Sequence, residues 1–588
     1  MDCESRSDYQ YPPYFPIFSS MNLFSKSIVR FFFLLLVALL LQPKSLLAQT
    51  KKGLDDKINE AFKPVSDFFS QLVFFEVGGN PFVIYLLVGG AVFFTLYFGF
   101  VNLRYFRSAI NVVRGKYDDL DATESNVGSP EGKIDREDQG EVSHFQALAT
   151  AVSGTVGNGN IAGVAFAIAL GGPGATFWMI ICGLLGMSTK FVECTLGVRY
   201  RDIDNGKVYG GPMYYLKKGL EERNLTRLGG ILAVIFAICC VGGSFGGGNA
   251  AQSNQATIVV KQLLSLNSTS SGAIIGLVMA ALVGLIIIGG IKRIASVTEK
   301  IVPFMALLYI IACSYILVIN YDFIDDAFSL IFNEAFNPKA IGVGGVIGVL
   351  MVGFKRAAFS NEAGAGSASI AHSAVKTNYP ASEGLVSLLE PFIDTVVICT
   401  MTALVIITFN NSDSNNQEFT YGDMTKFENV EYLDIDNNGK KEYVMEITNA
   451  SGSKEYQNVK GKVLIDGNLE EGAGITQKAF AKYIPFSEIF LTIAVFLFAI
   501  STMISWSYYG LQSWKFLFGR GKNADLVYKI LFLVFVVIGS AASMDSIWAF
   551  SDAMIFAMVF PNMIGLFILA PVVRKELASY IQKIKEKG

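Results

Sequence analysis

Charged residues are scarce in this chain of 588 residues: they make up 16% of it, against about 25% in a typical soluble domain. Hydrophobic residues make up 52%, and the chain has 57 glycines. This composition argues against a large soluble enzyme and against a disordered chain, and it favours closely packed membrane helices. The net charge of −3 gives no reason to expect a nucleic-acid partner.

Histidine and paired cysteine are also lacking. The two histidines, His144 and His372, lie far apart in the sequence, which argues against a multi-histidine metal centre and a catalytic histidine relay. We find no nucleophile–base pair, so we do not expect an enzyme. Six of the seven cysteines lie in apolar runs without paired spacing, which predicts buried free thiols.

The N-terminal residues 1–48 have the features of a secretory signal peptide. Lys26 and Arg30 precede an apolar run, residues 31–41, that is too short to span a bilayer. Met21 is the natural start of such a signal, which would make residues 1–20 a start-site artefact. An uncleaved signal anchor is the alternative interpretation.

Eleven further apolar segments can each hold a membrane helix of about 20 residues. Their ranges are 81–101, 145–170, 174–197, 229–261, 272–290, 301–320, 342–371, 382–409, 483–510, 526–543 and 547–571. The sequence therefore predicts an all-α polytopic membrane protein embedded in a lipid bilayer, with the first of these helices in an N-terminal segment, residues 49–144.

Lysine and arginine gather in alternate loops. Segments 102–144 and 198–228 are rich in both, whereas loops 171–173 and 544–546 have neither. Basic loops stay in the cytoplasm, so we predict a multi-pass protein of the plasma (inner) membrane whose tail, residues 572–588, is cytoplasmic.

The polar loop 410–475 should then be extracytoplasmic. It carries thirteen acidic and six basic residues. The alternating stretches "EYVMEIT" and "GKVLID" predict short strands. Its "DIDNNG" (434–439) has the spacing of a calcium loop, but Met445 stands at the twelfth position and a hairpin turn is favoured. The sequence indicates no function for this insertion.

Two apolar segments are interrupted by polar and glycine-rich stretches. Segment 145–170 is broken at Gly154–Asn160, and segment 342–371 at Ser360–Ser367. The two lie five segments apart, so if the first helix is an accessory, the rest form two sets of five, 145–341 and 342–571. An odd number per set gives opposite topologies, which predicts an inverted-repeat transporter with a site near the membrane midplane. The alternative is that the glycines only permit close packing.

Such a break exposes backbone groups inside the membrane. Free N–H groups near Asn158 suit a carboxylate, and free carbonyls near Thr155 suit a cation or an ammonium group. A zwitterionic amino acid together with Na⁺ would satisfy both. A passive channel is a further class, but no repeated ring of charges supports a pore.

Other polar residues in the predicted spans are candidates for a role or for simple pairing. Glu362 and Asp394 are intramembrane acids, which are functional candidates by default. Lys190 and Glu193 are three apart on one predicted helix, which predicts an ion pair. Arg356 either gates an outer vestibule or pairs with an acid. Trp506 lies in an interfacial belt or covers a pocket.

Four segments carry long and specific motifs: "SGTVGNGNIAGVAFAIALGGPGATFWM" (153–179), "FKRAAFSNEAGAGSASIAHSA" (354–374), "DTVVICTMTAL" (394–404) and "STMISWSYYG" (501–510). These motifs closely resemble those of the alanine/glycine:cation symporter family. The resemblance covers roughly residues 80–575 apart from the insertion. It implies a LeuT-type 5+5 inverted repeat plus one accessory helix, and uptake of alanine or glycine coupled to Na⁺ or, alternatively, to H⁺, without an organic cofactor.

The resemblance also implies site residues. Substrate contacts are expected at Thr155, Asn158, Gly159, Asn160, Gln252, Ser360, Asn361 and Trp506. Sodium ligands are expected at Ser153, Val156, Ser501 and Thr502. Asn158 stands where the family usually has threonine, so the preferred small amino acid stays open.

Overall fold

The computed structural model describes residues 54–120, 140–266, 270–338, 345–411, 430–433, 442–448, 454–459, 461–465 and 468–587. The predicted signal peptide and the calcium-like stretch 434–439 lie outside these residues.

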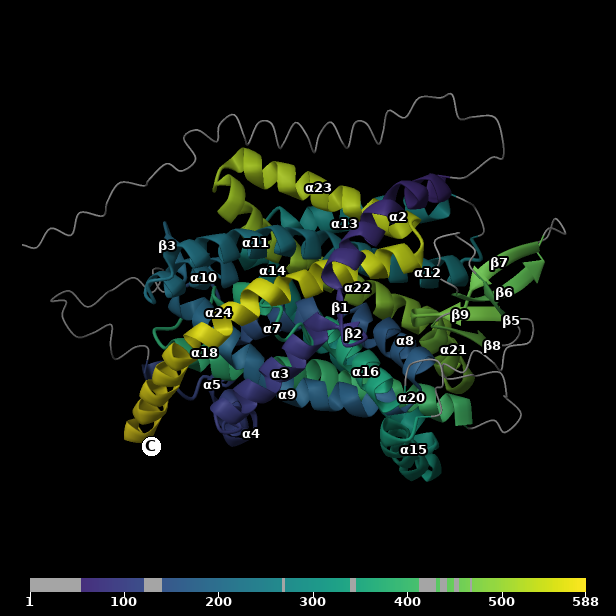
Figure 1. Ribbon diagram of the computed structural model, residues 1–588, viewed down its shortest axis with the longest axis horizontal. Coiled ribbons are helices and arrows are strands. Elements are labelled where there is room, and N and C mark those ends of the chain that lie inside the picture. The colour runs from purple at the N-terminus through teal and green to yellow at the C-terminus, as the bar shows by residue number, and fades with distance from the viewer. Residues whose placement is uncertain are drawn as a thin grey trace, which may run out of the picture. The chain divides into compact units, whose positions relative to one another are not determined.

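Helices make up most of the described chain (Figure 1). In the N-terminal half they are α2 (Leu54–Val73), α3 (Phe82–Tyr97), α4 (Val101–Arg104), α5 (Phe106–Val113), α7 (His144–Thr155), η3 (Asn158–Asn160), α8 (Ala162–Gly171), α9 (Gly174–Arg199), α10 (Pro212–Glu221), α11 (Thr226–Phe245), η4 (Gly246–Ala250), α12 (Ala251–Leu263) and α13 (Ser271–Ile287). The later helices are α14 (Gly290–Ile319), η5 (Tyr321–Phe323), α15 (Ile324–Phe336), α16 (Gly345–Asn361), α17 (Ala368–His372), α18 (Pro380–Ser387), α19 (Leu389–Pro391), η7 (Phe392–Cys399), α20 (Thr400–Asn411), α21 (Ala473–Tyr483), α22 (Ser487–Phe518), α23 (Lys522–Ala541) and α24 (Met544–Lys587).

Seven described helical runs are long and apolar enough to cross a membrane. They are Gly174–Arg199, Thr226–Leu263, Gly290–Ile319, Pro380–Asn410, Ser487–Phe518, Lys522–Ala541 and Met544–Lys587. Three shorter apolar runs are Phe82–Tyr97, Asn158–Gly171 and Ser271–Ile287. Each apolar segment expected from the sequence overlaps one or more described helices, which confirms a helical multi-pass protein. The division into two sets of five plus an accessory helix stays a prediction.

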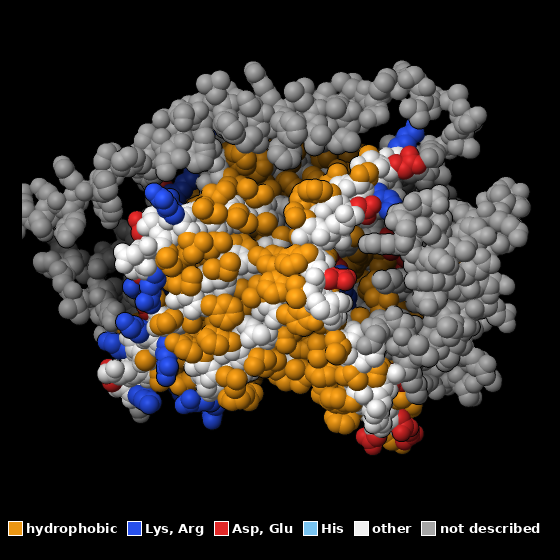
Figure 2. All heavy atoms as spheres, in the orientation of Figure 1, with side chains coloured by type: hydrophobic (Ala, Val, Ile, Leu, Met, Phe, Trp, Pro, Cys, Tyr) orange, Lys and Arg blue, Asp and Glu red, His pale blue; other side chains and the backbone are white. Residues whose placement is uncertain are grey.

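The face drawn in Figure 2 carries a broad apolar area across its middle. Exposed side chains such as Leu277 of α13 and Leu307 of α14, which are 66% and 59% exposed, face outward and fit contact with lipid. Lys and Arg side chains gather at the end of the molecule where α24 terminates, which we call the basic end (Figures 1 and 2). Because basic loops stay in the cytoplasm, the basic end is predicted to be the cytoplasmic one, and this orientation stays a prediction.

The described strands are short and antiparallel. In the insertion, β5 (Val430–Leu433), β6 (Glu442–Thr448) and β7 (Lys454–Asn458) form one sheet, and β8 (Lys462–Ile465) pairs with β9 (Asn468–Glu471). The remaining hairpins are β1 (Glu76–Val77) with β2 (Asn80–Pro81), and β3 (Asp202–Asp204) with β4 (Lys207–Tyr209). The strands expected in "EYVMEIT" and "GKVLID" are therefore confirmed as β6 and β8.

Two helices contain π-helical turns that sequence reasoning did not expect. The segment η4 joins α11 to α12, and η7 joins α19 to α20. Glycine is needed in η4 because a Cβ on Gly248 would lie 2.1 Å from Cγ of Trp506. Such turns often accompany functional sites, and both lie beside the broken helices described next.

Candidate functional site

The first broken helix is interrupted where the sequence predicted. Helix α7 starts with a capping box between Ser143 and Gln146 and ends at Thr155. A single 3₁₀ turn, η3, follows before α8 begins at Ala162. Gly157 permits the close approach of α22 at this point, because a Cβ there would lie 2.4 Å from Oγ1 of Thr502. The break is fully buried, so its polar groups need partners inside the protein.

The structure brings Asn158 and Gln252 together. The backbone N–H of Asn158 donates to Oε1 of Gln252 at 3.0 Å, and Nδ2 of Asn158 donates to the Gln252 carbonyl at 3.1 Å. Gln252 is held in turn by a 2.9 Å hydrogen bond from Nε2 to the carbonyl of Gly247 in η4. Oδ1 of Asn158 has no hydrogen-bond partner among the described residues, although the side chain is only 1% exposed. An unpaired buried acceptor of this kind fits a donor group such as an ammonium.

A second contact joins the first break to α22. The hydroxyl of Thr502 donates to the Ser153 carbonyl at 3.0 Å, and the Ser153 hydroxyl donates to the Ser501 carbonyl at 2.8 Å. The Ser501 hydroxyl instead bonds back to the carbonyl of Phe498 at 2.9 Å, a common geometry for serine in helices. The buried neutral oxygens of Ser153 and Thr502 are of the type that hard cations prefer.

The second broken helix is also interrupted where expected, between α16 and α17. Glu362 has a φ of 55°, in the left-handed region that disfavours most side chains. Its carboxylate accepts from the Ser367 hydroxyl and, at 2.9 Å, from Nε1 of Trp506. The N–H of Gly364 donates to Glu193 at 2.9 Å, and Asn562 donates to the Gly364 carbonyl at 2.8 Å. Protein side chains thus fix the shape of this break.

Asp394 in η7 links the two breaks. Nδ2 of Asn160 donates to Oδ1 of Asp394 at 2.6 Å, and the Ser360 hydroxyl donates to Oδ2 at 2.9 Å. Thr395 also donates to Oδ2, at 2.7 Å, and accepts from Nδ2 of Asn361 at 3.0 Å. Asn160, Ser360 and Asn361 therefore lie together, as expected of residues from one site.

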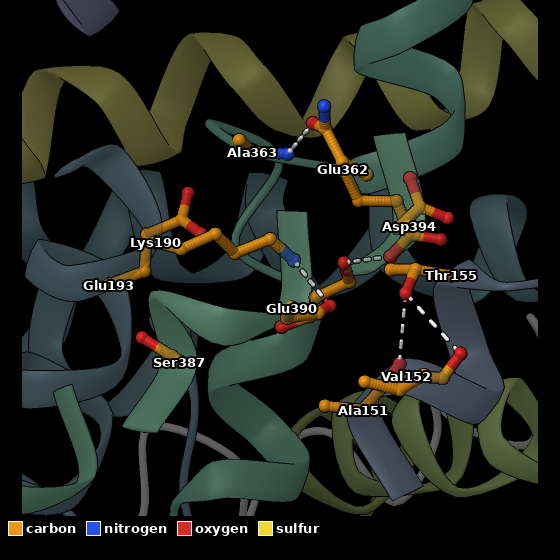
Figure 3. Close-up of polar contacts among 12 residues, drawn as sticks. Ala151, Val152, Thr155, Lys190, Glu193, Glu362, Ala363, Ser387, Glu390 and Asp394 are labelled. Atoms are coloured by element: carbon orange, nitrogen blue, oxygen red, sulfur yellow. Dashed lines mark hydrogen bonds and ion pairs between the residues drawn. The ribbon is translucent and has the colours of Figure 1, made fainter. Parts of the chain in front are cut away.

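Two of the implied substrate residues have other contacts. Figure 3 shows the Thr155 hydroxyl directed back at its own helix, where its acceptors are the carbonyls of Ala151 at 3.3 Å and Val152 at 3.4 Å. Trp506 is 1% exposed, which excludes the interfacial belt, and it packs against η4 rather than projecting into an open space.

Two predictions about charged residues have clear outcomes. Lys190 pairs with Glu390 at 3.0 Å (Figure 3) rather than with Glu193, so the pair predicted within one helix is wrong. Arg356 pairs with Asp552, as one of its two interpretations required. The sequence reasoning passed over Glu390, although an acid inside the span 382–409 is itself a signal of a buried contact.

The described cysteines are free and at least partly buried, as predicted. No group of three or more histidine, cysteine, aspartate or glutamate residues suited to a metal ion occurs in the described part of the chain.

The chain was compared with family models and with known proteins. The model of the sodium:alanine symporter family matches residues 65–429 and 458–588. A sodium/alanine symporter, AgcS, of Methanococcus maripaludis is 36% identical over 85% of this chain and 94% of its own length. The amino-acid carrier protein AlsT of Bacillus subtilis is 30% identical over 86% of this chain and 90% of its own length.

A manganese transporter of Eremococcus coleocola has a solved structure that covers 76% of this chain and 82% of its own, with 13% identity and a TM-score of 0.44. A likeness this weak carries no argument about this chain. The family match leaves out residues 430–457, which hold the β5–β7 sheet of the insertion except for its last residue, Asn458. From the extent of the match and from the two relatives, this chain belongs to the sodium:alanine symporter family, a family of membrane transporters.

Proposed function

We propose that this chain imports a small neutral amino acid, alanine or glycine, together with Na⁺ by alternating access. The observation that carries the proposal is the first break. It combines a buried acceptor, Oδ1 of Asn158, that has no hydrogen-bond partner in the described part of the chain, with a hydroxyl–carbonyl contact between Thr502 and Ser153 one turn away. The first suits an ammonium group and the second suits a cation.

The amino acid would lie between the two breaks. Its carboxylate would take the N–H groups of Asn158 and Gly159 at the start of the second half-helix, displacing Gln252 Oε1 from the Asn158 amide. Its ammonium group would meet Oδ1 of Asn158. A Cβ on Gly159 would already stand 3.6 Å from Cα of Ser360, in ordinary contact, so the space between the breaks suits a small side chain.

The coupling ion would bind between α7 and α22. The carbonyls of Ser153 and Val156 and the hydroxyl of Thr502 would supply neutral oxygen ligands, with Ser501 joining after its hydroxyl turns away from Phe498. Neutral ligands bind Na⁺ without burying an uncompensated carboxylate. The name of the relative from Methanococcus maripaludis, a sodium/alanine symporter, supports the same ion and substrate.

The proposal is tested by uptake of labelled alanine into proteoliposomes with Na⁺, K⁺ or Li⁺ as the external cation. We expect uptake with Na⁺ and little with K⁺. In a competition panel, glycine should compete strongly, serine weakly, and phenylalanine and tryptophan not at all, because a tight pocket excludes large side chains. Strong inhibition by phenylalanine or tryptophan, or equal uptake with K⁺, would contradict the proposal.

A further inference from the structure

The two broken helices meet again at the basic end, far from the breaks themselves. Segment 140–142, just before α7, lies alongside segment 374–376, just after α17. The N–H groups of Glu141 and Val142 donate to the Ala374 carbonyl at 2.8 and 3.1 Å, and Lys376 N–H donates to the Val142 carbonyl at 2.8 Å. Val142 and Val375 form a parallel bridge. Both valine side chains are buried, whereas Lys376 beside them is exposed.

The approach of these segments depends on glycine and arginine. A Cβ on Gly140 would stand 2.2 Å from the Val375 carbonyl oxygen, so only glycine fits there. Arg201, two residues beyond the end of α9, donates to the carbonyls of Ser373, Val375 and Thr377 at 2.8, 2.5 and 2.9 Å. A guanidinium group thereby satisfies carbonyls that the end of α17 leaves without helical partners.

Both histidines of the chain lie beside the contact between segments 140–142 and 374–376. His144, the first residue of α7, and His372, the last of α17, each contact Glu383 of α18 through Nδ1, His372 at 2.5 Å. Nε2 of His372 lies 3.5 Å from Glu390, which pairs with Lys190 of α9 at 3.0 Å. The side chains of His372, Glu383, Glu390 and Lys190 are fully buried, and that of His144 is 11% exposed.

We propose that these contacts form a latch that closes the basic end of the protein and must open for the transported amino acid to leave there. The latch consists of segments 140–142 and 373–377, Arg201, His144, His372 and Glu383. Glu383 is its centre, because one carboxylate holds the inner half-helix of both breaks to α18. Separating α7 from α17 would break backbone hydrogen bonds and an ion pair together, which makes the closed state cooperative.

The proposal rests on the transport function, since a latch has a purpose only in a chain that opens to both sides. The test therefore measures how fast a buried position is labelled when neither amino acid nor Na⁺ is present. A cysteine replaces Ala151, a fully buried residue of α7, and its reaction with a membrane-impermeant maleimide is timed from each side of the membrane. The parent chain, with its own buried cysteines, is the blank.

Arg201→Gln and Glu383→Gln should each speed labelling from the basic end by about tenfold or more, because Arg201 loses three half-buried hydrogen bonds to backbone carbonyls and Glu383 loses its charge in a buried contact. Lys217→Gln, an exposed change on α10 near the same end, should leave the rate unchanged. Unchanged rates in correctly inserted Arg201→Gln and Glu383→Gln proteins, or a rise only from the opposite side, would overturn the latch.

A cross-link supplies a second measurement should Glu383→Gln fail to fold. With Val142→Cys and Val375→Cys, oxidation should lower the labelling of Ala151→Cys from the basic end to the blank value, and reduction should restore it. Either single cysteine alone should be insensitive to oxidation. Labelling that persists after complete cross-linking would show that the basic end opens elsewhere.

Discussion

The two broken helices differ in how their polar groups are used. In the first break the partners of Ser153 and Asn158 are neutral amides and hydroxyls, those of Gln252 and Thr502, and Oδ1 of Asn158 keeps no partner among the described residues. Asn160, the last residue of the break, instead donates to the carboxylate of Asp394. In the second break, the carboxylates of Glu193 and Glu362 and the amide of Asn562 hold the chain in its turn. Similar glycine-rich sequences thus serve two purposes.

This difference indicates a division of labour. A group that must exchange partners with a ligand is best paired with weak, neutral neighbours, whereas a break that must keep its shape needs strong, charge-assisted hydrogen bonds. We therefore infer that the first break binds the transported species and that the second positions Trp506 and η7 around it. The predictions below separate these two roles.

The largest effect is expected from Gly157→Ala in the first break. The new Cβ would lie 2.4 Å from Oγ1 of Thr502 and 3.0 Å from Oε1 of Gln252, so both partners of the break would move. Displacements of about 1 Å at a binding site can cost about 100-fold, and we expect such a fall in the initial rate of alanine uptake.

The matched control is Gly163→Ala in α8, where the nearest atom to the new Cβ would be 3.7 Å away. It should retain near-normal uptake. Equal loss in both variants would mean that the helix tolerates no added methyl group and that the break itself is not special.

The proposed Na⁺ site can be tested by removing either of two neighbouring hydroxyl groups on α22. Thr502→Ala removes a group that already contacts Ser153 across the break, whereas Ser501→Ala removes one that bonds to its own helix. Thr502→Ala should raise the Na⁺ concentration for half-maximal uptake by about tenfold, the order expected for one hydrogen-bonding ligand of a charged group.

The shift for Ser501→Ala should be smaller, and the double variant should show the largest shift or no uptake while still inserting normally. Wild-type Na⁺ dependence in the double variant would mean that Na⁺ binds elsewhere in the protein. Asp394 and Glu362 would then be tested next, and coupling to H⁺ would be reconsidered.

In the second break, Glu362→Gln should act on stability more than on recognition. Glutamine keeps an acceptor for Trp506 but replaces the second carboxyl oxygen, which accepts from the Ser367 hydroxyl, with an NH₂ group, so the midpoint of thermal unfolding should fall. The alanine concentration for half-maximal uptake should change by no more than about threefold, because the first break is untouched. Loss of Na⁺-driven uptake at an unchanged unfolding midpoint would instead give Glu362 a direct part in coupling.

A change in selectivity is expected at the gap between the breaks. Gly159→Ala adds a Cβ at 3.6 Å from Ser360, which folding tolerates but which narrows the space for the substrate. The ratio of alanine to glycine uptake should fall by about fivefold, since one methylene is worth about 1–3 kcal/mol in a pocket. An unchanged ratio would place the substrate side chain away from Gly159.

The sequence was sufficient to predict where the two helices are broken. It was insufficient to predict which residues contact the broken segments. Glycine and asparagine inside an apolar run showed where α7 and α16 end, because a membrane helix without such residues has no reason to stop. The partners come from distant segments: Gln252 reaches Asn158 through a π-helical turn, and Asp394 reaches both Asn160 and Ser360. Nothing local in the sequence fixes such pairings.

The contacts between charged side chains were harder still to predict from the sequence. Spacing alone favoured Lys190 with Glu193, but the packing of α9 against α19 offers Glu390 instead. His144 and His372 were set aside because they are far apart in sequence, yet both reach Glu383. The helix α2 was also missed, since its packing on α24, with Ser66 donating to the Ser546 carbonyl at 2.7 Å, depends on a segment 480 residues away.

The central claim is that Na⁺ drives this chain to concentrate a small amino acid. The most direct measurement is alanine accumulation in proteoliposomes under an inward Na⁺ gradient, with the pH equal on both sides and choline replacing Na⁺ in the control. We predict internal alanine above the external concentration with Na⁺, and collapse of the accumulation when an ionophore dissipates the Na⁺ gradient. Accumulation driven by a pH gradient without Na⁺, or mere equilibration under every condition, would contradict the claim.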